Sequence, residues 1–204
     1  MIRIWRIPFS TNVERVALAL GHKGLSAEWV DVDPADRSEV ERISGQALVP
    51  VLELDGRVLA DSTAIIEELE RIQPDPPLYP DDPARRAEIE VFVDWFNRVW
   101  KRPPNELEAE LSKAEPDRAT VERLGAEIAG ALDLFEALLH DRDHLFGEFG
   151  VADCIVFPFL KYAVLHDPAD EELFHRILVE HQRLEGGYPR LEAWIHRVDE
   201  RPRA

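Results

Sequence analysis

The sequence VPVLELDGRVLA at residues 49–60 decides how the first part of the chain folds. Two apolar runs flank Asp55-Gly56, and a two-residue Asp-Gly loop between apolar runs is a strong signal for a β-hairpin. Pro50 is compatible with the first residue of a strand. From these residues alone we expect a trans Val49-Pro50 bond, because only ~5% of X–Pro bonds in folded proteins are cis.

The residues on either side of this hairpin alternate between strand and helix patterns. Short apolar or alternating runs predict strands, and apolar residues at helical spacing predict helices. The predicted strands are 2–7 and 26–32, and the predicted helices are 12–23, 35–44 and 62–72. The order is strand, helix, strand, helix, hairpin, helix, and its first three elements form a βαβ unit with a parallel strand pair. This order is the thioredoxin-like pattern.

A proline-rich segment separates this region from the rest of the chain. Residues 73–83 (QPDPPLYPDDP) hold five of the fifteen prolines, and proline lacks an amide donor and disfavours helix in the residue before it. Beyond it the strand patterns disappear, and amphipathic stripes predict five helices at 89–100, 121–138, 151–163, 174–178 and 191–198. We therefore expect a thioredoxin-like domain at 1–73, a linker at 74–83 and an all-helical domain at 84–204.

Composition and charge exclude several classes of function. The net charge of −17 disfavours binding to nucleic acid or anionic membranes, and no apolar run approaches the length of a membrane span. We expect a cytoplasmic protein, because the N-terminus lacks a signal-peptide apolar run. The single cysteine, Cys154, rules out an intrachain disulfide and a CxxC redox pair. No metal site is predicted, since His140 and His144 lack an HExxH pattern.

The turn PFSTNVERV at residues 8–16 has a structural and a functional interpretation. In the structural one, Ser10 and Thr11 simply begin a helix, and Thr11 with Glu14 fits a capping box. In the functional one, a hydroxyl at a helix N-terminus donates to an anion held there. A thiolate is such an anion, and this environment lowers a thiol pKa from its usual value of about 8.5.

The segment ADSTAIIEEL at residues 60–69 also has two interpretations. Either Asp61 or Ser62 would cap a helix well. Alternatively, a helix N-terminus with a free hydroxyl binds a carboxylate, and the neighbouring aspartate binds an ammonium group. Together, Asp61 and Ser62 would then hold the α-amino acid end of a ligand.

The segment FGVADCIVFPFL at residues 149–160 predicts the start of a buried helix. If Gly150 is the N-cap, Asp153 lies at the third helical position, where its carboxylate interacts favourably with the helix dipole. We interpret this motif as structural. Cys154 lies in the apolar stripe of the same helix, where a free cysteine acts as a small hydrophobic residue.

Taken together, these motifs resemble the glutathione S-transferase superfamily over nearly the whole chain. No single motif is specific for this family, but the order and spacing of the motifs are. A proline-rich linker between the two domains adds to the resemblance. The motifs are the PFS turn at 8–10 before a helix with Arg15-Val16, the VPVL strand at 49–52 with its Asp-Gly hairpin, Asp61-Ser62 before the next helix, and VAD at 151–153. The resemblance implies the fold of that family, a thioredoxin-like domain followed by an all-helical domain.

The resemblance also implies a binding site for glutathione as co-substrate. Ser10 matches the serine that hydrogen-bonds the glutathione sulfur in serine-type classes. Val49 matches the residue whose backbone pairs with the cysteine moiety, and Pro50 matches the family's cis-proline. Asp61 and Ser62 match the residues that bind the γ-glutamyl end.

For the second substrate, the resemblance implies a pocket beside the first turn and the first helices of the second domain. Phe9, Trp95 and Trp100 are the residues that we expect there, although aromatic residues at such spacing are also typical of core packing. Asp153 matches the aspartate of the family's helix-capping motif. The resemblance further implies a homodimer, with the first domain of one chain against the second domain of the other.

The implied activity is that of a serine-type glutathione transferase, which conjugates the glutathione thiolate to a small apolar electrophile, as in detoxification. Two residues depart from the family pattern: Asp61 stands where glutamate or glutamine is usual, and Leu48 where lysine or glutamine is common, with Gln46 two residues away. These departures leave open a non-catalytic binding or interaction module. A glutathione-dependent isomerase or dehalogenase on the same fold, or the use of another thiol, also remains open.

Overall fold

The computed structural model describes residues 1–204 and divides into two compact units. The first unit comprises Met1–Pro80 and Glu200–Ala204, and the second comprises Asp81–Asp199. None of the helices combines the length and the apolar character needed to cross a membrane.

The first unit has the expected thioredoxin-like βαβαββα order. Its elements are β1 (Ile2–Arg6), α1 (Thr11–Lys23), β2 (Glu28–Asp31), α2 (Ser38–Ser44), β3 (Val51–Leu54), β4 (Arg57–Ala60) and α3 (Ser62–Ile72). The sheet order is β2-β1-β3-β4, with β1 parallel to β2 and the other pairs antiparallel. Asp55 and Gly56 have φ values of 49° and 78°, as a two-residue hairpin turn requires. The predicted sheet and hairpin are therefore confirmed.

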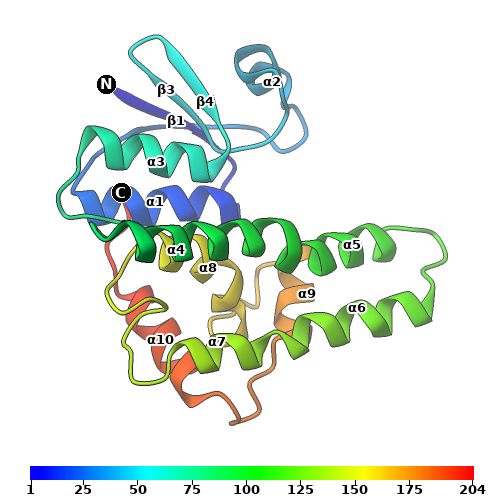
Figure 1. The fold of residues 1–204 in the computed structure, drawn as a ribbon. Helices are drawn as coiled ribbons and strands as arrows, with labels where there is room; N and C mark the ends of the chain where they lie inside the picture. Colours follow the sequence, from blue (N-terminus) through cyan, green and yellow to red (C-terminus); the bar gives the residue numbers. More distant parts are fainter. The chain divides into compact units, whose positions relative to one another are not determined.

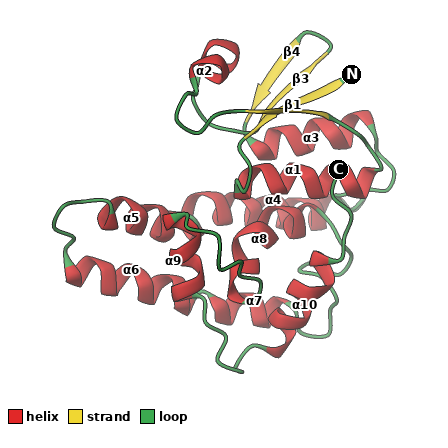
Figure 2. Cartoon of the chain, turned by 180° about the vertical axis from the view of Figure 1, so that it is seen from behind, coloured by secondary structure: helices red, strands yellow, loops and turns green.

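The two faces of this sheet are covered by different helices. Trp5 and Val51 are opposite each other in the register and pack with Val40 of α2. Ile4 and Leu52, the next pair along, have their side chains on the other face because side chains alternate along a strand. That face is covered by α1 and α3, which lie side by side (Figures 1 and 2). Ile4 and Leu52 are both fully buried there.

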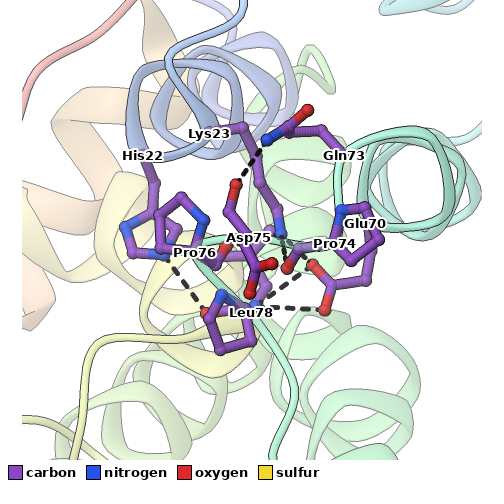
Figure 3. A network of polar contacts seen from close by, with 9 residues as sticks. His22, Lys23, Glu70, Gln73, Pro74, Asp75, Pro76 and Leu78 are labelled. Atoms are coloured by element: carbon purple, nitrogen blue, oxygen red, sulfur yellow. Dashed lines mark hydrogen bonds and ion pairs between the residues drawn. The ribbon is translucent and has the colours of Figure 1, made fainter.

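The proline-rich segment is fastened to the first unit by a polar network (Figure 3). The fully buried ammonium of Lys23 contacts the Glu70 carboxylate and the carbonyls of Pro74 and Pro76, the latter at 3.1 and 2.6 Å. Glu70 also accepts a hydrogen bond from the Leu78 amide at 3.1 Å. Residues 74–80 of the linker expected at 74–83 therefore belong with the first unit.

The C-terminal tail also belongs to the first unit and not to the expected domain at 84–204. Arg203 donates to the carboxylate of Glu14 at 3.0 Å, and the Ala204 amide donates to the carbonyl of Ala17 at 3.3 Å. The tail passes so close to α1 that a Cβ on Gly21 would lie 2.0 Å from the Pro202 carbonyl oxygen. A glycine is required at this position because no side chain fits.

The second unit is all helical, as expected. Its elements are α4 (Pro83–Trp95), the π-helical segment η1 (Phe96–Trp100), α5 (Arg102–Leu111), α6 (Arg118–Gly130), α7 (Leu132–Leu138), α8 (Val151–Leu160), the 3₁₀ turn η2 (Lys161–Ala163), α9 (Leu173–His181) and α10 (Pro189–Asp199). The single helix predicted at 121–138 is in fact two, α6 and α7, separated at Ala131. Helix α5 was not predicted, and Pro103 and Pro104 lie near its start. Both prolines lie in its first turn, where no amide donor is needed.

Asp153 has the structural role that the sequence suggested. Its carboxylate accepts hydrogen bonds from the Gly150 amide at 3.0 Å, the Leu145 amide at 3.2 Å and the Trp194 indole at 2.7 Å. It therefore joins the start of α8 to the preceding loop and to α10. Complete burial raises the pKa of Asp153 to about 6.

Candidate functional site

The sheet register brings three segments that are distant in sequence to one end of the first unit. Trp5 in β1 is opposite Val51 at the start of β3, and Val51 is opposite Ala60 at the end of β4. The turn after β1, the residues before β3 and the residues after β4 therefore meet at the same edge. These segments contain Ser10, Val49-Pro50 and Asp61-Ser62.

Ser10 is the N-cap residue of α1, but its hydroxyl makes no capping hydrogen bond. The side chain is half-buried at the positive end of a 13-residue helix. The capping box predicted from Thr11 and Glu14 is wrong, because the helix already begins at Thr11 and the Glu14 carboxylate binds Arg203 of the tail instead. The Ser10 hydroxyl is thus available at a helix N-terminus.

Phe9 precedes Ser10 in an unusual conformation. Its φ is 67°, in the left-handed region that bulky residues rarely adopt, and 74% of the residue is exposed. A strained backbone at such a position is often associated with function. The turn therefore holds an exposed aromatic residue next to Ser10 in the chain.

Val49 precedes a cis bond to Pro50, so the trans bond expected from the residues alone is wrong, and the cis form implied by the resemblance is present. The strand β3 begins only at Val51. Neither the amide nor the carbonyl of Val49 takes part in the backbone hydrogen bonds of the turns and loops. The Val49 backbone is therefore free to pair with an extended ligand, as in strand addition.

The loop before Val49 is held by its own side chains. The Gln46 side chain forms hydrogen bonds with both backbone groups of Leu48. Its Oε1 accepts from the Leu48 backbone amide at 2.7 Å, and its Nε2 donates to the Leu48 carbonyl at 2.8 Å. Ser44 donates to the Gln46 carbonyl at 2.8 Å. Gln46 is thus used to shape the loop, while the Leu48 residue is 66% exposed.

Asp61 and Ser62 form the start of α3. Oδ1 of Asp61 accepts from the amides of Thr63 and Ala64 at 2.9 and 3.1 Å, so the structural interpretation, a helix cap, is confirmed. Oδ2 takes no part in these bonds and the residue is exposed. Asp61 also has a φ of 95°, outside the usual range for a residue with a side chain.

Ser62 is buried, and its hydroxyl oxygen accepts a hydrogen bond from Nη1 of Arg15 at 3.2 Å. Arg15 lies in α1 and is only 1% exposed. Burial lowers the pKa of Arg15 to about 9, and the Asp61 carboxylate opposes this effect. Sequence reasoning missed Arg15. The available signal was its place in α1 between the buried Val13 and Val16.

A second arginine lies beside the loop before Val49. Arg37 donates to the carbonyls of Pro34 and Ala47, at 3.2 and 3.4 Å. Arg37 thus supplies positive charge beside the loop before Val49, and Arg15 supplies it beneath Ser62. The sequence showed no basic cluster for an anionic ligand, because these two residues are far apart along the chain.

Trp95 and Trp100 belong to the second unit. Trp100 is 4% exposed and stacks on Phe96, with ring centroids 4.5 Å apart and planes 10° apart. It also packs edge-on against Phe135 and Phe159. Trp95 is half-buried against Phe92. Trp100 is therefore part of the aromatic core of this unit, whereas Trp95 keeps an accessible edge.

Comparison with known proteins identifies the family of both units. Residues 5–77 match the glutathione S-transferase N-terminal domain, and residues 118–197 match the glutathione S-transferase C-terminal domain. Glutathione S-transferase GstB of Escherichia coli is 28% identical over 212 residues, which cover 99% of this chain and 95% of that protein. A probable maleylacetoacetate isomerase of Caenorhabditis elegans is 42% identical over 84 residues, 41% of this chain and 39% of that protein.

The fold agrees with this assignment. A glutathione S-transferase of Methylobacterium radiotolerans, solved in complex with glutathione sulfonate, superposes with a TM-score of 0.77 at 25% identity. The match covers 98% of this chain and 91% of that one. With both domain families matched in order on a βαβαββα unit and an all-helical unit, the chain belongs to the glutathione S-transferase superfamily of enzymes.

Proposed function

We propose that this enzyme is a serine-type glutathione transferase that conjugates the glutathione thiolate to a small apolar electrophile. The observation that carries the proposal is the Ser10 hydroxyl, which makes no capping bond at the N-terminus of α1. It lies at the sheet edge that also presents the free Val49 backbone. A hydroxyl donor and a helix dipole at one point favour an anion such as a thiolate.

Glutathione would lie extended along Val49, with its cysteine moiety paired to the Val49 amide and carbonyl. Its γ-glutamyl end would lie at Asp61 and Ser62, because the register places the end of β4 beside the start of β3. Oδ1 of Asp61 caps α3, which leaves Oδ2 to accept from the ligand ammonium. The shorter side chain of aspartate therefore still offers one oxygen to the ligand.

Ser10 would donate a hydrogen bond to the sulfur and lower the thiol pKa, which is about 8.5 in free cysteine. The thiol proton passes to solvent, and the sulfur lone pair forms a bond to the electrophilic carbon. The leaving group departs with the electrons of the bond that breaks. The enzyme contributes mainly the thiolate and the proximity of the two reactants.

The electrophile would lie against the exposed ring of Phe9. Of the two tryptophans expected to contact the electrophile, Trp95 is the stronger choice because it is only half-buried. Trp100 is only 4% exposed, so we propose that it acts through the packing of the helix. The family also suggests a cytoplasmic homodimer, and light scattering at micromolar concentration tests the dimer.

The experiment that tests this function combines calorimetry with steady-state kinetics. Glutathione should bind saturably, and Ser10→Ala should retain binding while kcat/KM for a model aryl halide falls about 100-fold or more, as when an oxyanion donor is removed. The ultraviolet absorbance of bound thiolate should fall in parallel. Thr11→Val, which removes the neighbouring hydroxyl, is the matched control. An unchanged rate in Ser10→Ala would refute the role of Ser10.

A second candidate activity is glutathione-dependent isomerisation, which the resemblance to the nematode isomerase favours. In that reaction the thiolate adds to a double bond and leaves again, so glutathione is recovered unchanged. Turnover of maleylacetoacetate without consumption of glutathione would favour this candidate. Saturable binding without turnover of any substrate would favour a non-catalytic module.

A further inference from the structure

The C-terminal tail, residues 200–204, lies along one stripe of α1. Its contacts with the helix are at Glu14, Ala17 and Gly21. These positions are three and four residues apart and therefore share one face of the helix. Both views of the fold show the C-terminus beside α1 (Figures 1 and 2). The tail thus holds its own side chains at defined places along the helix that begins after Ser10.

Arg203 is the side chain that the tail brings to the start of α1. Its Nε and Nη2 donate to the same oxygen of Glu14, Oε1, at 3.2 and 3.0 Å. Its Nη1 donates to the Arg201 carbonyl at 3.1 Å. The Arg203 and Glu14 side chains are 27% and 16% exposed, so the pair is largely shielded from solvent. The three nitrogens together fix the guanidinium against this carboxylate.

Glu14 lies where a negative charge would oppose the proposed reaction. Its backbone amide donates to the Ser10 carbonyl at 3.0 Å, so Glu14 is one helical turn beyond Ser10. Helical side chains lean toward the N-terminus, and Cβ atoms four residues apart on a helix are roughly 5–6 Å from each other. An unpaired carboxylate this close to a bound thiolate would raise the pKa of the thiol, because like charges repel. Pairing with Arg203 offsets this negative charge.

We propose that Arg203 is a positioning residue that neutralises Glu14 and so keeps the N-terminus of α1 attractive to the glutathione thiolate. This inference rests on the proposed thiol site and adds to it a residue from the opposite end of the chain. Arg203 acts through Glu14 and not through contact with the ligand. The tail is thereby part of the electrostatics of the site.

Three other charged side chains lie near this end of the first unit. They are the buried Arg15 of α1, Asp61 at the start of α3, and Arg37 beside the loop before β3. None of them is changed in the variants described below. A difference between those variants and the parent protein therefore reports on the pair of Glu14 and Arg203.

The test is a titration of the bound thiol in the full-length protein with saturating glutathione, followed by the ultraviolet absorbance of the thiolate. In Arg203→Gln the pKa of the bound thiol should rise by about 0.5–1 unit, as for one added charge in a partly shielded site. Below that pKa, kcat/KM for a model aryl halide should fall about three- to ten-fold, because the thiolate fraction falls by that factor. The rate should recover at higher pH, where the thiol is fully ionised in both proteins.

Further variants separate the charge of Arg203 from the packing of the tail. The double variant Glu14→Gln with Arg203→Gln removes the carboxylate as well, so the thiol should return to its parental pKa although the tail has lost the same contact. Arg203→Lys keeps the positive charge and should keep the parental pKa. Arg71→Gln is the matched control, since Arg71 pairs with Glu68 at the C-terminal end of α3; it should change nothing. Circular dichroism establishes that each variant is folded.

The outcomes distinguish this inference from the function on which it rests. If the parent protein neither binds glutathione nor lowers the pKa of its thiol, the thiol site itself is refuted, and the role of Arg203 with it. If the parent lowers the thiol pKa and Arg203→Gln lowers it equally, only the role of Arg203 is refuted. If Arg203→Gln raises the pKa and the double variant does not restore it, neutralisation of Glu14 is refuted as the cause.

Discussion

Replacing Lys23 by methionine should destabilise the first unit more than any surface substitution. The Lys23 ammonium is fully buried and contacts three oxygen groups, the Glu70 carboxylate and the carbonyls of Pro74 and Pro76 (Figure 3). Methionine fills a similar volume but donates no hydrogen bond. The substitution therefore leaves a carboxylate without its cation and two carbonyls without their donor.

The contacts allow the magnitude to be estimated. Removing one partner of a buried ion pair costs about 3–5 kcal/mol. The Glu70 side chain is 17% exposed and still accepts from the Leu78 amide, so it recovers part of its solvation. We therefore expect the lower end, about 3 kcal/mol in the free energy of unfolding.

Urea unfolding followed by circular dichroism measures this loss, and hydrogen exchange localises it. Exchange should increase in peptides covering residues 73–80. The matched control is Lys113→Met, because Lys113 also pairs with a glutamate, Glu110, but its side chain is 59% exposed. An exposed pair contributes about 1 kcal/mol or less. Equal losses in the two variants would contradict the reasoning.

A double-mutant cycle tests the pairing itself. Glu70→Gln alone leaves the buried Lys23 charge with only two carbonyls, whereas the double variant has neither charge. The double variant should therefore lose less stability than the sum of the single variants, by about 1–2 kcal/mol. Strict additivity would refute the ion pair as the source of the stability.

Two further predictions concern other buried positions. Burial raises the pKa of Asp153 from 3.8 to about 6, so the folded protein holds a proton that the unfolded chain releases between these pH values. Relative to Asp153→Asn, the free energy of unfolding should fall by about 3 kcal/mol as pH rises from about 3 to about 7, and denaturation at several pH values measures this change. A difference that does not change with pH would exclude it. Gly21→Ala should displace residues 200–204, because its Cβ would lie 2.0 Å from the Pro202 carbonyl oxygen. The expected loss is about 1–3 kcal/mol, with faster carboxypeptidase trimming than in Gly130→Ala, whose Cβ meets nothing within 4 Å.

The fold of the first unit could be predicted because its signals are local. The Asp55-Gly56 turn, Gly24 at the end of α1 and the alternating strands each depend on residues close in sequence. The linker was interpreted less well. Prolines do disfavour regular structure, but they do not prevent carbonyls such as those of Pro74 and Pro76 from accepting hydrogen bonds from Lys23. That contact depends on tertiary structure, which the local pattern does not contain.

The second unit reveals the limits of helical periodicity. The apolar stripe over 121–138 continues across Ala131, so the pattern gave no sign that α6 ends at Gly130 and α7 begins at Leu132. The position of Asp153 in the first turn of α8, in contrast, was suggested by its spacing from Gly150, because capping is a local feature. Its bonds to Leu145 and Trp194 were not foreseeable, since Trp194 is 41 residues away.

The candidate site was predicted from residues that begin or end elements, and this also explains what was missed. Ser10, Val49, Asp61 and Ser62 lie in turns next to predicted strands, where polar residues stand out. Arg15 lies within the helix pattern, where a charged residue is normally assigned to the solvent side. The only local sign of its burial is its place in α1 between the buried Val13 and Val16.

The acidity of the protein gives a physical reason for a buried arginine at this place. With a net charge of −17, a cation on the surface is readily neutralised by a neighbouring carboxylate, as Arg3, Arg6 and Arg57 are. A neutralised cation adds little to the attraction of an anionic ligand, and salt screens what remains. A guanidinium beneath Ser62 keeps its field in a region that solvent does not screen. In so acidic a protein, burial therefore keeps the charge of Arg15 away from most of the carboxylates at the surface.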